Sequence, residues 1–311
     1  MKKSEEKPTH EDVLALRMLV RAYEDFQGIR KGTDNRIGRK ADGTAQNVAA
    51  RAFKSSDLES FISFADVCAA QEEALLKQVH QVLKRFPIYN DYLKGIDGVG
   101  EIASAHIISN FDIEKATTVS KMWQFAGLNP GMVNGKKSID KKDYKEAMGP
   151  IVAEYAADPK KKNIKYIVLT DTQIRGDKLT PGFLAPYNAD LRTALVGVMA
   201  DGFIMSAFRW PEVTETQYNN TPEDDRRIKD DKFQVLAIKP NSYAQFYHDY
   251  KNRLAREDKW KDESAGHRDR SAKRYMVKMF IKNLYVAWRT IEGLPVRAPY
   301  QEEYLEHKHS A

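Results

Sequence analysis

Apolar side chains recur every three or four positions along most of this chain, and this spacing predicts amphipathic α-helices. The spacing holds over five long stretches, residues 9–26, 57–86, 188–208, 241–256 and 268–291. We find no internal sequence repeat of the kind that indicates a solenoid. We therefore expect a mainly α protein.

The ends of the first two predicted helices carry capping signals. Thr9 is a typical N-cap residue, and Ser56 with Glu59 has the spacing of a capping box. Pro87 is predicted to end the second helix. A helix of about thirty residues exposes a narrow apolar seam that needs a partner helix. The partner is either the first helix, in a long N-terminal helical hairpin, or the same helix of another subunit in a homo-oligomer.

Several segments depart from the helical pattern. Residues 30–47 are polar and contain glycine, so we expect a loop or a basic arm there. Residues 131–165 are rich in lysine, and we expect loops broken by a short apolar helix at 147–157. Residues 165–174 alternate and are rich in β-branched side chains, which predicts a strand.

Changes in composition divide the chain into four regions. We expect an N-terminal helical region at 1–90 and a domain containing a helical hairpin at 91–210. An acidic and polar loop at 211–232 separates them from a C-terminal helical region with a basic face at 233–311. The predicted fold is thus mainly α with one short strand element.

The overall composition narrows the class of partner. Lys and Arg number 50 against 44 Asp and Glu, and the resulting formal net charge of +6 favours an anionic partner. No apolar run reaches the roughly 20 residues of a membrane-spanning helix. The first residues also lack the apolar segment of a secretory signal. We expect a cytoplasmic protein with no membrane partner.

Few residues indicate a metal or cofactor site. Cys68 is the single cysteine, which excludes an internal disulfide, and we expect it to be buried in its helix. His307 and His309 lie in a polar tail with no carboxylate or cysteine partner for a zinc ion. The sequence contains no glycine-rich P-loop and no nucleophile elbow. We expect no cofactor and no metal.

The segment LKGIDGVGEIASAHII, residues 93–108, joins two glycines to the start of a helix. Gly98 and Gly100 permit a sharp turn with positive φ and leave room for a partner to approach. The helix that follows directs unpaired N–H groups and its positive dipole end at the turn, which favours a phosphate. The pattern resembles the helix-hairpin-helix motif, which holds nucleic-acid backbones without reading their sequence. The plainer alternative is an ordinary tight corner between helices.

The last predicted helix carries a row of cations spaced by four residues, which stack along one face and repel one another. A polyanion along this row would relieve the repulsion, so we expect phosphate contact. The alternative is a solvated face with salt bridges to other elements. The predicted DNA contacts are Gly98, Val99, Gly100, Glu101, Lys136, Lys137, Arg192, Arg270, Arg274, Lys278 and Lys282.

From Leu93 to about Met205, the order of features resembles the C-terminal domain of the insertion sequence 110/116/902 transposases. Those proteins place a hairpin before a helix that ends in a Gly-Leu-x-Pro turn, here GLNPG at 127–131. They then carry Asn-x-x-Leu-Arg-x-x-Leu, here NADLRTAL at 188–195. The C-terminal segment of this chain looks like that of small phage and archaeal relatives. The resemblance implies a DNA-binding protein of a phage or mobile element.

Two departures from the family pattern argue against catalysis. The transposases supply a serine nucleophile from a Ser-Gly segment, and the equivalent residues here are Asn134 and Gly135. An amide cannot form a phosphoserine link, and Ser138, the nearest hydroxyl, would serve only if the loop shifted register. The family also begins with a nuclease domain whose first strand ends in a metal-binding aspartate, and no such strand precedes residue 93.

The sequence therefore predicts a protein that binds duplex or branched DNA through its phosphates, and it leaves open whether the protein is also an enzyme. Three alternatives stay open. An active transposase or recombinase would use Ser138 or a nuclease encoded elsewhere. RNA is a second candidate partner, because the family is known for an RNA partner. A structural or assembly protein would direct the same basic face at an acidic protein surface.

Overall fold

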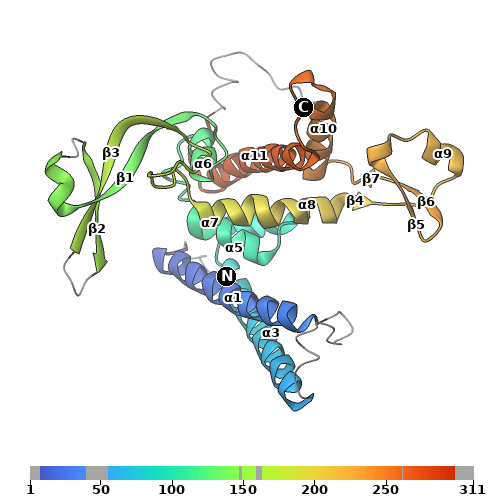
Figure 1. Ribbon diagram of the computed structural model, residues 1–311, viewed down its shortest axis with the longest axis horizontal. Helices are drawn as coiled ribbons and strands as arrows, with labels where there is room; N and C mark the ends of the chain where they lie inside the picture. The colour runs from blue at the N-terminus through green and yellow to red at the C-terminus, as the bar shows by residue number, and fades with distance from the viewer. Residues whose placement is uncertain (1–7, 40–54, 147–148, 159–162, 261, 298–311) are drawn as a thin grey trace, which may run out of the picture. The chain divides into compact units, whose positions relative to one another are not determined.

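The computed structural model describes residues 8–39, 55–146, 149–158, 163–260 and 262–297, and it is mainly α, as predicted (Figure 1). The chain divides into two compact units, Met1–Asp112 and Ile113–Ala311. This division falls inside the predicted domain 91–210. The glycine-containing hairpin therefore belongs to the same unit as the N-terminal helices.

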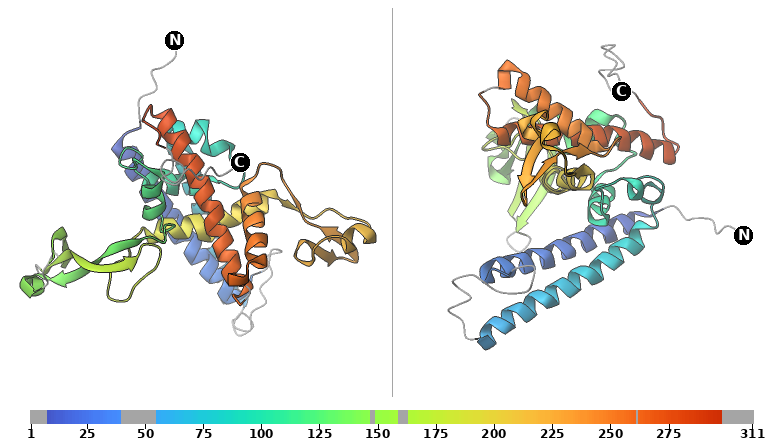
Figure 2. Two further views of the ribbon diagram at one scale, coloured as in Figure 1. Left: turned by 90° about the horizontal axis from the view of Figure 1, so that it is seen from above. Right: turned by 90° about the vertical axis from the view of Figure 1, so that its right-hand side faces the viewer.

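The first unit is built on a long helical hairpin. α1 (His10–Ile37) and α3 (Ser55–Leu83) lie side by side and antiparallel, as Figures 1 and 2 show. The shorter helices α4 (Pro87–Asp91), η1 (Leu93–Gly95) and α5 (Glu101–Asn110) follow. The seam between the long helices buries Leu16, Val20, Ala65, Cys68, Val79 and Leu83. The partner of the long helix is thus the first helix of the same chain.

The ends of these helices differ in part from the prediction. Thr9 caps α1 in a capping box, as expected, but α1 continues through the first part of the predicted loop 30–47 and ends at Gly38, with φ 63°. The remainder of that loop, from residue 40, lies outside the described residues. α3 begins at Ser55, one residue before the predicted N-cap Ser56, and the side chain of Ser56 lies outside the described part of the chain. Pro87 starts α4 instead of ending α3.

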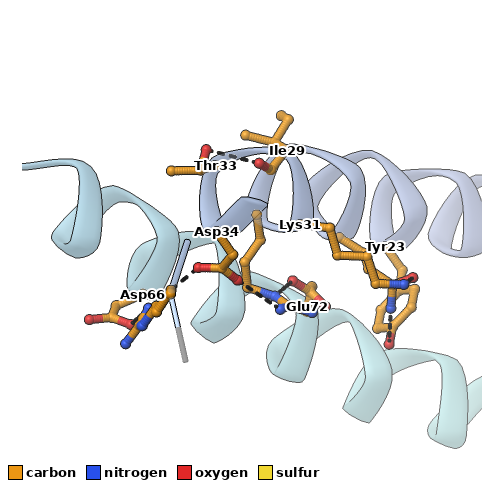
Figure 3. A network of polar contacts seen from close by, with 10 residues as sticks. Tyr23, Ile29, Lys31, Thr33, Asp34, Asp66 and Glu72 are labelled. Atoms are coloured by element: carbon orange, nitrogen blue, oxygen red, sulfur yellow. Dashed lines mark hydrogen bonds and ion pairs between the residues drawn. The ribbon is translucent and has the colours of Figure 1, made fainter. Parts of the chain in front are cut away.

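Ion pairs between α1 and α3 explain why the polar end of α1 is helical (Figure 3). Arg30 donates to both carboxylate oxygens of Glu72, with Nη2 and Oε2 3.0 Å apart, and to Asp34 at 3.3 Å. Arg39 contacts Asp66 at 2.7 Å. The Glu72 side chain is only 9% exposed, so its charge depends on Arg30. Apolar periodicity cannot register such pairs, which is why the sequence predicted a loop.

Replacing Arg30 by methionine should lower the free energy of unfolding by about 2 kcal/mol, because it leaves the Glu72 carboxylate buried and unpaired. Urea unfolding followed by circular dichroism measures the change. Lys77→Met is the matched control on α3, since Lys77 pairs with Glu73 while both side chains are well exposed. Its cost should stay below about 0.5 kcal/mol. Equal costs for the two variants would contradict the assignment of Glu72 as a buried charge.

The second unit begins with α6 (Val119–Phe125) and a three-stranded antiparallel sheet. The strands are β1 (Met132–Asp140), β2 (Ile151–Asp158) and β3 (Asn163–Arg175), in the order β1-β3-β2. The short helix η2 (Lys141–Glu146) joins the first two. The strand predicted at 165–174 is the central one. The sheet stands apart from the helices of its unit (Figure 1).

This sheet overturns two predictions for residues 131–165. The lysine-rich segment is largely strand instead of loop, and the helix predicted at 147–157 is wrong, because β2 occupies most of it. β2 pairs with β3, with Ile151 opposite Val168 and Glu154 opposite Tyr166. A short apolar run fits a helix or a strand equally well by periodicity. The hydrogen-bonding edge of β3 decides between them.

Three long helices complete the unit, as predicted for 188–208, 241–256 and 268–291. The first is one continuous helix made of α7 (Ala189–Arg192), η3 (Thr193–Met199) and α8 (Ala200–Ala207). The others are α10 (Tyr243–Arg256) and α11 (Ala265–Ile291), with η5 (Asp258–Trp260) between them. Phe203 and Phe280, which lie in the core, have ring centroids 5.3 Å apart.

The middle segment of the first helix, η3, is a π-helix, and it keeps one face of that helix buried. Leu191, Leu195, Met199 and Phe203 are spaced by four, and each is at most 2% exposed. In a regular α-helix each such step would rotate the face by about 40°. A π turn contains an extra residue and so advances less per residue. The Ala200 N–H bonds to the Leu195 carbonyl, five residues back, as this geometry requires.

The segment predicted as a loop at 211–232 is folded. It contains α9 (Glu215–Asn219), η4 (Glu223–Asp225), β5 (Arg226–Lys229) and the start of β6 (Lys232–Val235). β4 (Phe208–Arg209) pairs with β7 (Ala237–Ile238) at its base. The Tyr218 and Phe233 rings lie 4.9 Å apart, and the Arg227 guanidinium lies 4.3 Å from the Trp210 ring. These aromatic contacts hold the segment together although none of its residues is fully buried, and the acidic composition gives no sign of them.

Candidate nucleic-acid interface

The predicted hairpin is present in the first unit, between η1 and α5. Gly98 has φ 86°, the left-handed conformation that favours glycine. Gly100 differs, because it is the extended N-cap of α5, with φ −79°, and a Cβ there would meet nothing within 4 Å. No side chain caps α5, and Val99 between the glycines is buried. The turn therefore requires one glycine, where the sequence argument used two.

The first residue of α5 bears on how an anion would approach the hairpin. Glu101 begins the helix, and its carboxylate contacts Nδ1 of His80 on α3. Both side chains are about one-third exposed. An acidic group at this position interacts favourably with the helix dipole and competes with a phosphate for it. Any contact of the hairpin with a phosphate therefore rests on main-chain N–H groups.

The basic row of the second unit lies along α11 and changes character along its length. Arg270 is exposed, and Arg274 is half-buried. Lys278 lies over the Trp123 ring, with Nζ 4.5 Å from its centroid, and burial lowers the pKa of Lys278. Lys282 at the far end has an interaction of its own. The row is thus not one solvated stripe, and its open end is the part that contains Arg270 and Arg274.

Three further arginines lie near enough to Arg274 for their charges to act on it, and we call the four residues the arginine cluster. Arg270 and Arg274 come from α11, Arg192 from α7 and Arg175 from the end of β3. Burial lowers the pKa of Arg274, and the positive charges of the other three lower it further, against the opposing charge of Asp177. Among the described residues, neither Arg270 nor Arg274 has a hydrogen-bond or ion-pair partner.

Asp177 is the acid at the cluster, and it is already engaged. Its two carboxylate oxygens accept hydrogen bonds from Nε and Nη2 of Arg175, both at 2.9 Å. Its main-chain carbonyl accepts a bond from Nη1 of Arg192 at 2.6 Å. Burial raises the pKa of Asp177, but the hydrogen bonds and charge of Arg175 outweigh burial and lower it overall. The charge of this carboxylate therefore interacts with three of the four arginines, Arg175, Arg192 and Arg274.

A tight turn at 127–131 positions Arg192. Gly127 has φ 67°, and a Cβ on it would lie 2.6 Å from the Tyr187 ring and 3.1 Å from Cδ of Arg192. The Arg192 guanidinium covers the same Tyr187 ring at 4.7 Å. Asn188 caps α7 through the Leu191 N–H. The two segments GLNPG and NADLRTAL, about sixty residues apart in sequence, therefore pack together.

Sequence reasoning missed Arg175 and Asp177. Arg175 follows the predicted strand 165–174 directly, and the Gly176 N–H donates to the Gly131 carbonyl at 2.8 Å. A hairpin returning to the GLNPG turn would have placed both residues near Arg192. Because the sequence argument treated 131–165 as loops, no such return was expected.

The remaining predicted residues lie on β1, away from the cluster. Lys136 and Lys137 are exposed, and Lys137 lies over the Phe183 ring at 4.8 Å. Ser138 is exposed opposite Ile167, whereas Met132 is opposite Arg175. Six residues of strand separate Ser138 from Met132 by roughly 20 Å. Asn134 has no hydroxyl to act as a nucleophile, and its side-chain oxygen accepts a hydrogen bond from Nε2 of Gln173.

Comparison of the chain with protein-family models, curated proteins and solved structures found no match. The resemblance to the transposase domain stays a prediction. Over the described ranges, no set of three or more His, Cys, Asp or Glu side chains is placed to hold a metal ion. In the same ranges no helix is both long and apolar enough to span a membrane. The arginine cluster is therefore the candidate binding site.

Proposed function

We propose that this protein binds nucleic acid, with DNA as the preferred partner, through contacts to the phosphate backbone. The observation that carries the proposal is the arginine cluster. Three arginines and one acid, Asp177, act on the charge of Arg274, and the carboxylate of that acid already accepts two hydrogen bonds from Arg175. Positive charge that a protein leaves uncompensated attracts polyanions, and phosphates are the anions for which arginine is best suited.

Two further surfaces support the proposal. The hairpin at Gly98 combines a turn of positive φ with a helix N-terminus that no side chain caps, and such a terminus favours a phosphate. The exposed lysines of β1, Lys136 and Lys137, add charge on an extended strand pair. Lysine, arginine and main-chain N–H groups commonly contact phosphates, and phosphate contacts carry no sequence information, so we expect binding that depends little on sequence.

Ser138 lies apart from the arginine cluster, although Lys136 and Lys137 are beside it on β1. Its hydroxyl lies on an exposed strand, roughly 20 Å along β1 from the residue opposite Arg175. A phosphoryl-transfer site needs its nucleophile close to the groups that hold the phosphate. We therefore expect Ser138→Ala to leave nucleic-acid binding unchanged, which makes this variant the control for nonspecific damage.

Fluorescence anisotropy with the full chain tests the proposal. Labelled duplex, branched and single-stranded DNA are titrated from 50 to 300 mM NaCl, with an RNA duplex as competitor. We expect dissociation constants of about 1–100 µM near physiological salt and a linear fall of log K with log salt. Lys136→Gln with Lys137→Gln should reduce that slope by about 2 if both lysines contact phosphates.

Each outcome decides between the candidate functions. Absence of DNA and RNA binding at 50 mM salt would overturn the proposal. Displacement of DNA by equal concentrations of RNA would reassign the partner to RNA. Binding that persists unchanged at 300 mM salt would also count against phosphate contacts, because such contacts are released by salt.

A further inference from the structure

We propose that the arginine cluster is a discrete site for one phosphate group, and that Asp177 is its resident counter-ion. This inference deepens the proposed function and rests on it for the source of the phosphate, a backbone phosphate of nucleic acid. It goes further in naming the residues that would surround a single tetrahedral anion. It also assigns a role to a carboxylate that opposes anion binding.

The guanidinium nitrogens of Arg274 are available to an incoming anion. Arg274 is half-buried, and within the described chain it forms no hydrogen bond. The fully buried side-chain nitrogens and oxygens without a partner belong, among described residues, to Arg17, Asp34 and Ser242. The nitrogens of Arg274 therefore still reach solvent. A guanidinium that has lost part of its hydration, and has gained no partner, is a ready donor to an incoming anion.

The positive charges around Arg274 make the binding of an anion there more favourable. Arg192, Arg270 and Arg175 all act on it as like charges. The next residue on the same helix shows the contrast, because Lys273 has carboxylate partners in Asp201 at 2.7 Å and Asp269 at 3.4 Å. The chain thus compensates one of two neighbouring cations fully and leaves the other exposed to repulsion. A bound anion would supply the missing compensation.

The number of donors favours phosphate over a carboxylate. Each oxygen of the Asp177 carboxylate already accepts one hydrogen bond from the Arg175 guanidinium. Arg270 and Arg274 remain, and Arg192 uses one nitrogen on the Asp177 carbonyl. A phosphate group offers more acceptor oxygens than a carboxylate and accepts forked bonds from several arginines at once. The site therefore fits a tetrahedral oxyanion.

Asp177 sets the affinity of this site. Its negative charge lies among the same arginines and repels an incoming phosphate, while its bonds hold Arg175 in place. Asparagine has the same shape and keeps an acceptor oxygen for Arg175, but it carries no charge. Asp177→Asn should therefore tighten phosphate binding, in the direction opposite to the loss of an arginine.

Titration of the full chain with inorganic phosphate, at constant ionic strength, tests the inference. Arginine Nε–Hε resonances of ¹⁵N-labelled protein report binding at individual side chains. We expect saturable shifts with a millimolar dissociation constant, about tenfold weaker binding in Arg274→Gln, and about threefold tighter binding in Asp177→Asn. Arg253→Gln is the matched control, because Arg253 lies on α10 and pairs with Glu257. Its affinity should stay within about twofold of the parent.

The same variants titrated with duplex DNA separate the two proposals. Loss of both phosphate and DNA affinity in Arg274→Gln supports both. If the chain binds no nucleic acid but binds phosphate, and Arg274→Gln abolishes that binding, the phosphate site stands. Nucleic acid is then not the source of the phosphate. Two results would overturn the phosphate site and leave the proposed nucleic-acid binding standing. In both, the chain binds DNA; in the first, phosphate shifts no arginine resonance, and in the second, Arg274→Gln binds phosphate as tightly as the parent. Weaker phosphate binding in Asp177→Asn would also overturn it.

Discussion

Replacing Arg289 by methionine is expected to lower the free energy of unfolding by about 4 kcal/mol, because three carbonyls would lose their hydrogen-bond donor. Arg289 on α11 is only 5% exposed. Its Nη1 donates to the carbonyls of Ile113 and Ala116 at 2.8 and 3.1 Å, and its Nε donates to that of Pro295 at 2.6 Å. The side chain thus ties the first residues of the second unit to its last helix.

Arg209→Met is the control for this prediction. Arg209 also donates to three main-chain carbonyls, those of Met205, Ser206 and Phe208, but it is exposed. Water can replace its bonds, so the loss should stay below about 0.5 kcal/mol. Urea unfolding followed by tryptophan fluorescence compares the two. Similar losses of unfolding free energy would show that burial of the three hydrogen bonds of Arg289 contributes nothing to stability.

Replacing Gly127 by alanine should cost about 3 kcal/mol, from two sources that add. Gly127 follows α6 with φ 67°, and its neighbours complete a typical helix end. The Leu128 N–H bonds to the Trp123 carbonyl, and the Gly127 N–H bonds to that of Gln124. An alanine here is strained by the left-handed conformation, and its Cβ would lie 2.6 Å from the Tyr187 ring. The ring and the Arg192 stem must then move.

Gly182→Ala separates the two costs. Gly182 has φ 79°, but a Cβ there would meet nothing within 4 Å, so only the strain of about 1 kcal/mol applies. The comparison uses thermal unfolding of both variants. A second measurement, the affinity for inorganic phosphate, should fall in Gly127→Ala and stay constant in Gly182→Ala. Equal unfolding costs would mean that Tyr187 is not held against the turn.

Helices with continuous apolar faces were predictable from the sequence, and elements stabilised by other interactions were not. The five long helices lie close to their predicted positions because burial of an apolar stripe dominates their formation. The end of α1 is stabilised instead by Arg30 within the helix and by Arg39 just after it, which pair with acids of α3. β2 depends on the edge offered by β3. Both depend on partners distant in sequence, which local spacing cannot reveal.

The candidate site was predictable only in part, for a related reason. The four-residue spacing identified Arg270 and Arg274 on one face, and the Asn-x-x-Leu-Arg pattern identified Arg192. Their convergence with Arg175 required the path of the β1–β3 strand pair, which the lysine-rich composition concealed. The spacing of the basic residues on α11 also gave no sign that Lys278 would lie over the Trp123 ring. Spacing locates charges on an element, whereas tertiary packing decides which of them stay exposed.

The π-helical segment η3 has a consequence for how related sequences should be compared. It lets Leu191 and Phe203, on either side of it, share one buried face, and it also sets where Asp201 meets Lys273 of α11. A relative with a regular α-helix would reach the same arrangement with one residue fewer. An alignment should therefore open a single-residue gap between positions 193 and 199. Forcing the two halves of the helix into one ungapped block would misassign every core position on one side.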